Sequence, residues 1–193
     1  MAFSNILFQK CDVSKWADVV SFFQSTYDKF GPIDAAISNA AINIVEPFDD
    51  LKDATKAKTS ELKEPDLSVL NVNMVGTWYV TKCAVHFFDK HPETASQLVL
   101  FGSVASFFDT PPLYTYCASK AAVVGLMRAL RTQLPKRNAT VNVIAPWMTS
   151  EQKPYVLFLL FLISHRPAAN CLCSSHGHGN RPHQRSMGRL AGE

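Results

Sequence analysis

Apolar residues recur at two different spacings along the chain, and the two spacings alternate. Short apolar runs bounded by turn residues predict buried strands at 6–11, 33–37, 97–101 and 140–145. Between them, apolar positions repeat at helical spacing and predict helices over 14–30, 66–90 and 113–134. Strands that alternate with long helices form βαβ units, so the sequence predicts an α/β fold with a parallel sheet.

The alternation ends near residue 150, where the composition also changes. Residues 155–163 are continuously apolar, and the tail that follows is crowded with His, Pro, Gly and Arg. We expect residues 1–150 to form one folded domain and residues 151–193 to be an atypical, disordered tail. The apolar run is about half of the ~20 residues that cross a bilayer, so no membrane span is expected.

The tail offers one alternative, a metal site. Cys171 and Cys173 are followed by His176, His178 and His183, and thiolates and imidazoles are zinc ligands. The spacing is not that of a usual zinc knuckle, and no periodic element would orient the ligands. We therefore expect no metal, and a histidine-rich metal-binding protein is an alternative that depends on the tail alone.

Net charge and cysteine positions indicate which partners and which cellular compartment to expect. The formal net charge is +3, and the basic residues are scattered through 1–150, so we expect no nucleic-acid partner. Cys11, Cys83 and Cys117 lie in apolar patterns without a disulfide spacing, which favours a reducing, cytoplasmic compartment. No basic segment followed by a long apolar run begins the chain, so we expect no signal peptide.

Three residues are typical of acid–base chemistry. Tyr116 and Lys120 are four positions apart, so on a helix they share a face. An ammonium beside a phenol favours the phenolate, which makes the phenol a usable acid or base near neutral pH. Ser103 follows the strand predicted at 97–101, on the loop that would face both residues.

Other motifs accompany these residues in register: Ser-Asn-Ala-Ala-Ile at 38–42, Asn73 within Leu-Asn-Val-Asn-Met-Val-Gly-Thr at 70–77, and Val-Asn-Val-Ile-Ala-Pro-Trp-Met-Thr at 141–149. With them the chain resembles the short-chain dehydrogenase/reductase family over residues 6 to about 149. The resemblance implies a partial doubly wound parallel sheet, Rossmann-like, without the family's first two strands and its last strand.

The resemblance also implies site residues. The catalytic tetrad would be Asn73, Ser103, Tyr116 and Lys120. Tyr116 would act as general acid or base, Ser103 would orient the substrate oxygen, and Asn73 would hold a water that relays the proton. Lys120 would support the tyrosine and bind the nicotinamide ribose. NAD or NADP would lie against Asp12, Asn39, Ala40, Ala41, Lys120, Pro146 and Thr149.

Some of these positions have alternatives or depart from the family. Asn73 is also a residue type that hydrogen-bonds backbone from a helix, and Asp12, like Ser14, is suited to cap the helix over 14–30. Ala41 and Trp147 stand where the family usually has glycine, so a cofactor would meet a tighter backbone there.

The family's glycine-rich turn, which holds the cofactor pyrophosphate at a helix N-terminus, has no counterpart in the sequence. We therefore expect weak cofactor binding, and two functions stay open. One is hydride transfer between nicotinamide and a secondary alcohol or ketone, with Phe107, Phe108 and Tyr114 favouring a bulky apolar substrate. The other is a catalytically inactive fragment, either an interaction module or an incomplete gene model.

The resemblance carries further structural expectations. The helices over 66–90 and 113–134 should pack side by side on one face of the sheet and form a homodimer interface. The strand at 6–11 would lack its family neighbours, so we expect it to pair with the strand at 33–37. The helix over 14–30 should leave its aromatic stripe partly open to water, and one face of the sheet should be under-covered.

Overall fold

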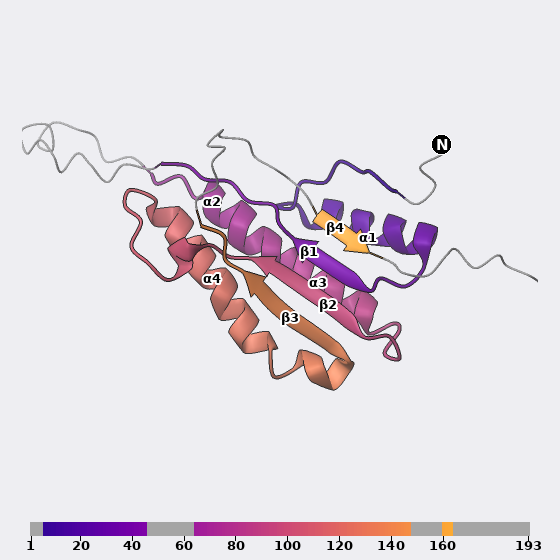
Figure 1. Cartoon of the computed structure of the whole chain (residues 1–193). Coiled ribbons are helices and arrows are strands. Elements are labelled where there is room, and N and C mark those ends of the chain that lie inside the picture. Colours follow the sequence, from indigo (N-terminus) through magenta and orange to yellow (C-terminus); the bar gives the residue numbers. More distant parts are fainter. Residues whose placement is uncertain (1–5, 46–63, 148–159, 164–193) are drawn as a thin grey trace, which may run out of the picture.

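A computed structural model describes residues 6–45, 64–147 and 160–163 (Figure 1). Its sheet has four strands in the order β3-β2-β1-β4. They are β1 (Ala35–Ser38), β2 (Ser96–Phe101), β3 (Ala139–Ile144) and β4 (Leu160–Ile163). β2 pairs in parallel with both β1 and β3, so the predicted partial parallel sheet is confirmed.

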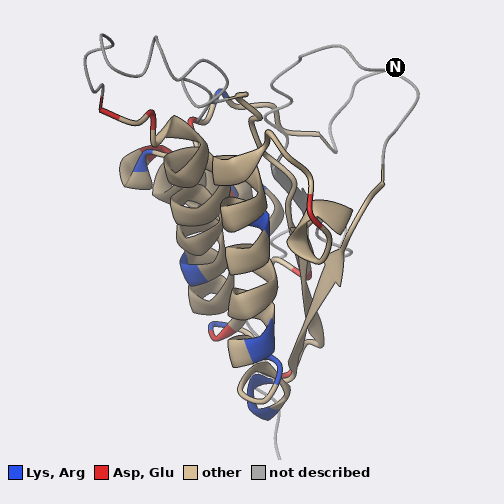
Figure 2. Ribbon diagram, turned by 90° about the vertical axis from the view of Figure 1, so that its left-hand side faces the viewer, with Lys and Arg blue, Asp and Glu red and all other residues tan. Residues whose placement is uncertain are grey.

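The helices of the described residues lie on one face of this sheet (Figures 1 and 2). They are α1 (Trp16–Phe30), α2 (Ser68–Leu70), a π-helical segment (Asn71–Gly76), α3 (Thr77–Phe88) and α4 (Tyr114–Leu130). α3 connects β1 to β2 and α4 connects β2 to β3. Because parallel crossovers share one hand, both helices fall on the same face, as the sequence predicts.

Each strand turns alternate residues toward the helices. In β2, Leu98 and Leu100 are fully buried, whereas Gln97, which points to the opposite face, is exposed. In β3, Val141 is buried and Ile144, at the other phase of the alternation, is 47% exposed. The core therefore lies between the sheet and one helical layer.

The edge of β1 differs from the sequence prediction. Residues 6–11 form no strand and do not pair with β1, so that prediction is wrong. Instead β4 pairs antiparallel with β1, with Ile163 opposite Ala35. An open strand edge needs a partner for its N–H and C=O groups, and the apolar run 155–163, which the sequence analysis assigned to the tail, contributes that partner.

Side chains of α1 hold the segment that was expected to be a strand. Lys29 Nζ donates to the Ile6 carbonyl at 2.9 Å, and Gln9 Nε2 donates to Ser21 Oγ at 3.0 Å. Both contacts direct the segment along the helix rather than along the sheet. Phe8 consequently remains 87% exposed.

The aromatic stripe of α1 is better covered than predicted. Phe23 is fully buried and its ring stacks on that of Phe87 in α3, with 5.7 Å between ring centroids. Trp16 meets Tyr79 edge-on at 5.3 Å and keeps 46% of its surface exposed. The predicted opening to water is therefore confined to the Trp16 end of the stripe, because α3 lies on the same face of the sheet as α1 and covers Phe23.

The π-helical segment joins α2 directly to α3, so residues 68–88 form one continuous helix. At its end Gly76 meets the loop that precedes α1. A Cβ atom on Gly76 would lie 2.8 Å from Val13 Cγ2, closer than real Cβ contacts allow. Glycine is therefore required here for the π-helical segment and the start of α1 to pack together.

α4 ends earlier than predicted, at Leu130, and a 3₁₀-helix (Leu134–Arg137) follows it before β3. Pro135 lies at the start of this 3₁₀-helix, where its missing N–H leaves no intrahelical bond unmade. Asn138, with φ of 54°, then turns the chain into the strand.

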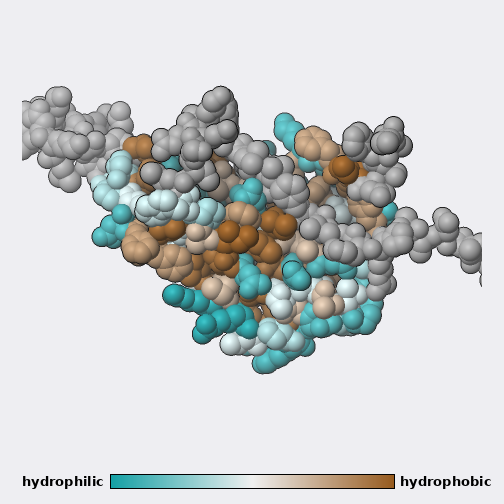
Figure 3. Space-filling model, viewed as in Figure 1, coloured by the Kyte–Doolittle hydropathy of each residue, from teal (hydrophilic) through white to brown (hydrophobic). Residues whose placement is uncertain are grey.

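The opposite face of the sheet carries no helix in the part of the chain that the structure describes. Figure 3 shows this face, with hydrophobic residues gathered over the middle of the sheet and hydrophilic residues along its lower edge. The predicted under-covered face is thus present among the described residues. None of the described helices is long and apolar enough to span a membrane.

One-sided coverage predicts a contrast between the two faces. Leu98→Ala removes a side chain buried under the helices and should lower the free energy of unfolding by about 2–5 kcal/mol. Ile144→Ala, on the face without helices, should cost about 1 kcal/mol or less. Urea unfolding of the wild-type chain and both variants checks this. Equal losses for the two variants would contradict one-sided coverage.

Candidate active site

A cleft of about 480 Å³ opens at the carboxyl ends of the three parallel strands. Open parallel sheets place ligands at this edge, because successive loops leave the strands side by side. The cleft brings together six of the residues that the sequence singles out, namely Asn39, Ala41, Ser103, Tyr116, Lys120 and Pro146.

Backbone hydrogen bonds extend the pairing of β2 and β3 into the cleft. Gly102 N–H donates to the Ile144 carbonyl at 2.9 Å, and Val104 N–H donates to the Pro146 carbonyl at 3.1 Å. These bonds fix Ser103, between the two donors, beside the loop that follows β3. A Cβ atom on Gly102 would lie 2.9 Å from Val143 Cγ1, so only glycine permits this close approach.

Tyr116 and Lys120 lie on one face of α4, as their spacing predicts. The Lys120 ammonium is 5.7 Å from the centroid of the Tyr116 ring and donates a 2.8 Å hydrogen bond to the Phe101 carbonyl. Lys120 is only 4% exposed, and burial lowers its pKa from 10.5 to about 8. The structure thus places a desolvated amine behind the tyrosine.

Ser103 is held by the short 3₁₀-helix (Val104–Ser106) that it caps. Its Oγ accepts from Ala105 N–H at 3.2 Å, while its own N–H donates to Ser106 Oγ at 3.2 Å. Ser106 Oγ in turn donates to the Lys120 carbonyl at 2.9 Å. Ser106 therefore ties the loop after β2 to α4, a role that the sequence analysis missed although Ser-x-x-Ser is a capping-box spacing.

Asn73 lies behind the cleft, not on its surface, and is fully buried. Its Oδ1 accepts from Ile42 N–H at 2.8 Å, and its Nδ2 donates to the Ile42 carbonyl at 2.9 Å and to Ser119 Oγ at 3.0 Å. The side chain thus binds backbone, which is the structural alternative left open for it. Its role as the holder of a water stays a prediction.

Ser119 is the second residue that the sequence analysis missed. It is fully buried in α4, and its Oγ donates to the Tyr116 carbonyl at 2.7 Å while accepting from Asn73. Its position three residues after Tyr116 was the available signal, because serine hydroxyls in helices bond carbonyls one turn earlier.

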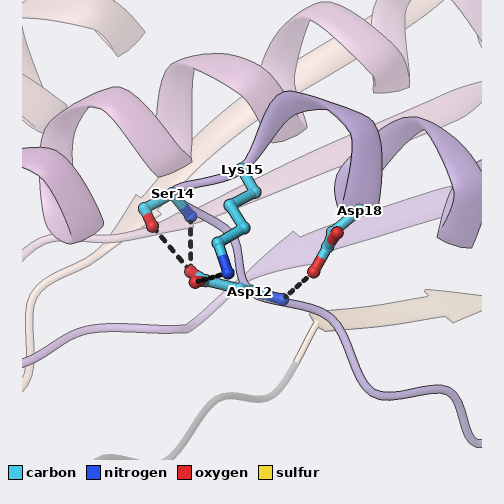
Figure 4. Close-up of polar contacts among 4 residues, drawn as sticks. All are labelled: Asp12, Ser14, Lys15 and Asp18. Atoms are coloured by element: carbon cyan, nitrogen blue, oxygen red, sulfur yellow. Dashed lines mark hydrogen bonds and ion pairs between the residues drawn. The ribbon is translucent and has the colours of Figure 1, made fainter.

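Asp12 does not line the cleft. Figure 4 shows its carboxylate turned to its own loop, where Oδ1 accepts from Ser14 N–H at 3.1 Å and from Ser14 Oγ at 2.7 Å. Oδ2 lies 3.4 Å from Lys15 Nζ, and the Asp12 N–H donates to Asp18 Oδ2 at 3.0 Å. The hydrogen bonds from Ser14, together with Lys15, hold the pKa of Asp12 below its usual value.

The predicted helix cap is wrong in detail. Lys15, and neither Asp12 nor Ser14, occupies the N-cap position of α1, and no side chain caps the helix there. Asp12 instead closes the turn just before the helix. The contact of Asp12 with NAD or NADP stays a prediction.

The remaining expected residues lie elsewhere. Ala40 is buried in the core beneath the cleft, and Thr149 lies outside the described residues. Phe107 and Phe108 do not line the cleft and are 54% and 66% exposed. The sequence analysis missed further lining residues that adjoin its motifs, namely Asn43, Thr110 and Leu113.

The residues fit one end of a nicotinamide cofactor better than the other. Lys120 Nζ and the Asn39 amide are donors suited to a ribose or carboxamide, and Ala41 and Pro146 line the cleft beside them. Among the described residues no helix begins at a glycine-rich turn, and the loop before α1 ends at Lys15 without one. A diphosphate would therefore find no cradle of backbone N–H groups in this part of the chain.

No group of three or more His, Cys, Asp or Glu among the described residues could hold a metal ion. The alternative metal ligands Cys171, Cys173, His176, His178 and His183 lie outside the described residues.

Comparison with known proteins agrees with the fold. The family model for short chain dehydrogenase matches residues 2–153. The chain therefore belongs to the short-chain dehydrogenase family. A solved structure described as a putative short-chain alcohol dehydrogenase from Sinorhizobium meliloti shares its fold, with a TM-score of 0.63 and 23% sequence identity over 74% of this chain and 52% of that chain.

Two fungal relatives show how much of a family member is present. Short-chain dehydrogenase/reductase prx4 of Penicillium rubens is 35% identical over 75% of this chain and 42% of its own length. The 5'-hydroxyaverantin dehydrogenase of Dothistroma septosporum is 30% identical over 71% of this chain and 48% of its own length. The chain thus spans less than half the length of these relatives.

The buried amine of Lys120 predicts a pH dependence of stability. The pKa of Lys120 is about 8 in the folded protein against 10.5 when solvated, so the unfolded chain binds more protons between these values. Stability from this residue should therefore rise with pH from about 8 to about 10.5 and be lowest, and constant, below about 8.

The measurement is urea unfolding of the wild-type chain and Lys120→Met across this range. The free energy of unfolding of the wild type, minus that of Lys120→Met, should rise with pH. Lys82→Met, at an exposed lysine of α3, is the matched control and should show no such rise. A pH-independent difference for Lys120→Met would mean that the amine is not desolvated.

Proposed function

We propose that this chain carries the catalytic part of an NAD(P)-dependent oxidoreductase that transfers hydride between nicotinamide and a secondary alcohol or ketone. The observation that carries the proposal is that Ser103, Tyr116 and Lys120 line a single cleft at the carboxyl ends of the parallel strands. A nicotinamide would supply or accept the hydride there.

The side chains have complementary tasks in this proposal. Tyr116 gives a proton to the substrate oxygen in reduction and takes it back in oxidation, while the Ser103 hydroxyl orients that oxygen. The Lys120 ammonium, 4% exposed and 5.7 Å from the centroid of the Tyr116 ring, supports the tyrosine and binds the nicotinamide ribose in this proposal. Asn73 does not touch the cleft, and in this proposal its main task is to hold the backbone of Ile42. Its second task is to hold the water that relays the proton.

The substrate proposed is bulky and apolar. Phe101, Leu113 and Trp147 line the cleft with apolar surface, and Trp147 is 63% exposed at its rim. One similar protein is named for a large apolar substrate, namely 11-beta-hydroxysteroid dehydrogenase A of Arachis hypogaea, which is 27% identical over 76% of this chain. Both observations favour a large hydroxyl or carbonyl compound over a sugar.

Cofactor binding by this chain is proposed to be weak, with NAD and NADP both open. Another relative is named NADP-dependent dehydrogenase M3 of Phoma sp., 30% identical over 71% of this chain. The alternative of an inactive interaction module is favoured by the missing diphosphate cradle. In isothermal titration, low-micromolar binding of either cofactor would overturn the proposed weak binding and favour the enzyme over the inactive module.

A cytoplasmic location is part of the proposal. Burial raises the pKa of the Cys11 and Cys83 thiols to about 11, so both are neutral and unreactive near neutral pH. Reduced, buried cysteines are typical of proteins in a reducing compartment.

The predicted homodimer would use the outer surfaces of the π-helical segment, α3 and α4. A groove of about 230 Å³ runs there, lined by Met74, Trp78, Leu126 and other residues. Met74 is 45% and Trp78 57% exposed, so two large apolar side chains face outward along the side of the groove formed by the π-helical segment and α3. Such a surface is typical of an interface between copies.

Replacement of Tyr116 tests the proposed reaction. With millimolar NADH or NADPH and an aromatic ketone, Tyr116→Phe should lower the rate of cofactor oxidation by about a hundredfold or more, because the proton donor is lost. Absorbance of the reduced nicotinamide follows the reaction.

Tyr114→Phe is the matched control for this test. Tyr114 lies on the same helix, is 43% exposed and does not line the cleft, so its activity should stay near that of the wild type. Equal activities of wild type and Tyr116→Phe would contradict the assignment of Tyr116.

Trp78→Glu tests the dimer. A carboxylate buried in the groove between copies would be unpaired, so this variant should sediment as a monomer where the wild type sediments as a dimer. Trp147→Glu replaces an equally exposed tryptophan outside the groove and should remain dimeric. A wild type that is monomeric at every concentration in sedimentation velocity would end the proposal.

A further inference from the structure

We infer that Ser119 is a positioning residue, whose hydroxyl couples the loop after β1 to Tyr116 through the side chain of Asn73. Its effect on the reaction depends on the proposed function. The coupling itself depends only on the hydrogen bonds of Ser119, Asn73 and Ile42.

The hydroxyl of Ser119 both donates and accepts a hydrogen bond. It donates to the Tyr116 carbonyl at 2.7 Å and accepts from Asn73 Nδ2 at 3.0 Å. Both serine and asparagine are fully buried, so water does not compete for either bond. A hydroxyl with its donor and one acceptor site engaged has a fixed orientation, unlike a serine that only fills space.

Ser119 provides the acceptor for one of the two N–H groups of the Asn73 amide. This amide has two N–H donors, of which one goes to the Ile42 carbonyl at 2.9 Å and the other to Ser119. Without the serine hydroxyl, one buried N–H would have no partner, and the amide would turn to regain one. That turn would disturb the 2.8 Å bond from Ile42 N–H to Asn73 Oδ1.

This coupling matters because it joins two walls of the cleft. Ile42 follows Ala41, which lines the cleft on the β1 side, and Tyr116 lines it from α4. No side chain caps the N-terminus of α4, one turn from Tyr116. Asn73 Nδ2 reaches α4 at Ser119, whose Oγ binds the Tyr116 carbonyl, so the two bonds tie this turn of α4 to the residue that holds the loop after β1.

A structural role alone predicts a different outcome from a positioning role. If Ser119 only packs, its removal should lower global stability and leave the relative rates at the cleft unchanged. If it positions the cleft, its removal should act locally on Ile42 and on the catalytic step.

Hydrogen exchange tests the coupling without any activity. In the full chain, Ser119→Ala should raise the exchange rate of the Ile42 amide by about tenfold or more relative to core amides of β2, because its acceptor is no longer held. Ser119→Thr keeps the hydroxyl and should stay near wild type. Ser21→Ala, an exposed serine of α1, is the matched control and should leave Ile42 unchanged.

Kinetics test the consequence for the reaction. Ser119→Ala should lower kcat by about tenfold with KM within about twofold, and Ser119→Thr should restore kcat. If the threonine variant does not fold, Ser119→Cys serves instead, since a thiol of similar shape bonds weakly and should give an intermediate kcat.

The two measurements separate the inference from the proposed function. Unchanged exchange at Ile42 in Ser119→Ala overturns the coupling, whatever the activity. Faster exchange at Ile42 in Ser119→Ala, together with no hydride transfer by the wild-type chain, supports the coupling and overturns the proposed function. Faster exchange with unchanged kcat in an active chain overturns the positioning role.

Discussion

A buried amide side chain must find hydrogen-bond partners inside the protein, and the cleft of this chain depends on how Asn73 meets that requirement. One amide N–H donates to the Ile42 carbonyl and the amide oxygen accepts from the Ile42 N–H, much as a neighbouring strand would pair with it. The loop after β1 is thereby fixed to the π-helical segment. Through Ser119 the same amide reaches α4, so three segments far apart in sequence share one buried polar centre.

Ser106 and Lys120 form a second set of contacts with backbone beside the cleft. Ser106 binds the Lys120 carbonyl, and Lys120 Nζ binds the Phe101 carbonyl at the end of β2. α4 is thus attached to the sheet by polar bonds at the level of the reacting groups and by apolar packing below it. Desolvation of Lys120 is the cost of this arrangement, and it lowers the pKa of the amine.

Much of the fold could be predicted because β1, β2, β3 and the helices between them each carry a clear apolar period. The cleft residues Ser103, Tyr116 and Lys120 could be predicted because strand ends and helical spacing decide where they lie. β4 could not, since its pairing depends on which distant segment satisfies the edge of β1. Ser119 and Ser106 were missed because a serine's partners are set by tertiary packing that one sequence does not show.

The π-helical segment 71–76 has a consequence for how the gene can change. Each helical residue advances the chain by about 100° around the axis, so loss of one residue there would rotate everything before it relative to α3. If α3 kept Trp78 in place, Asn73 would face away from Ile42. If Asn73 kept its bonds to Ile42, Trp78 would be turned away from its groove instead. Point substitutions in this segment alter single contacts, whereas insertions and deletions break the geometry outright. The geometry therefore requires the length of this segment as well as the identities of Asn73 and Gly76.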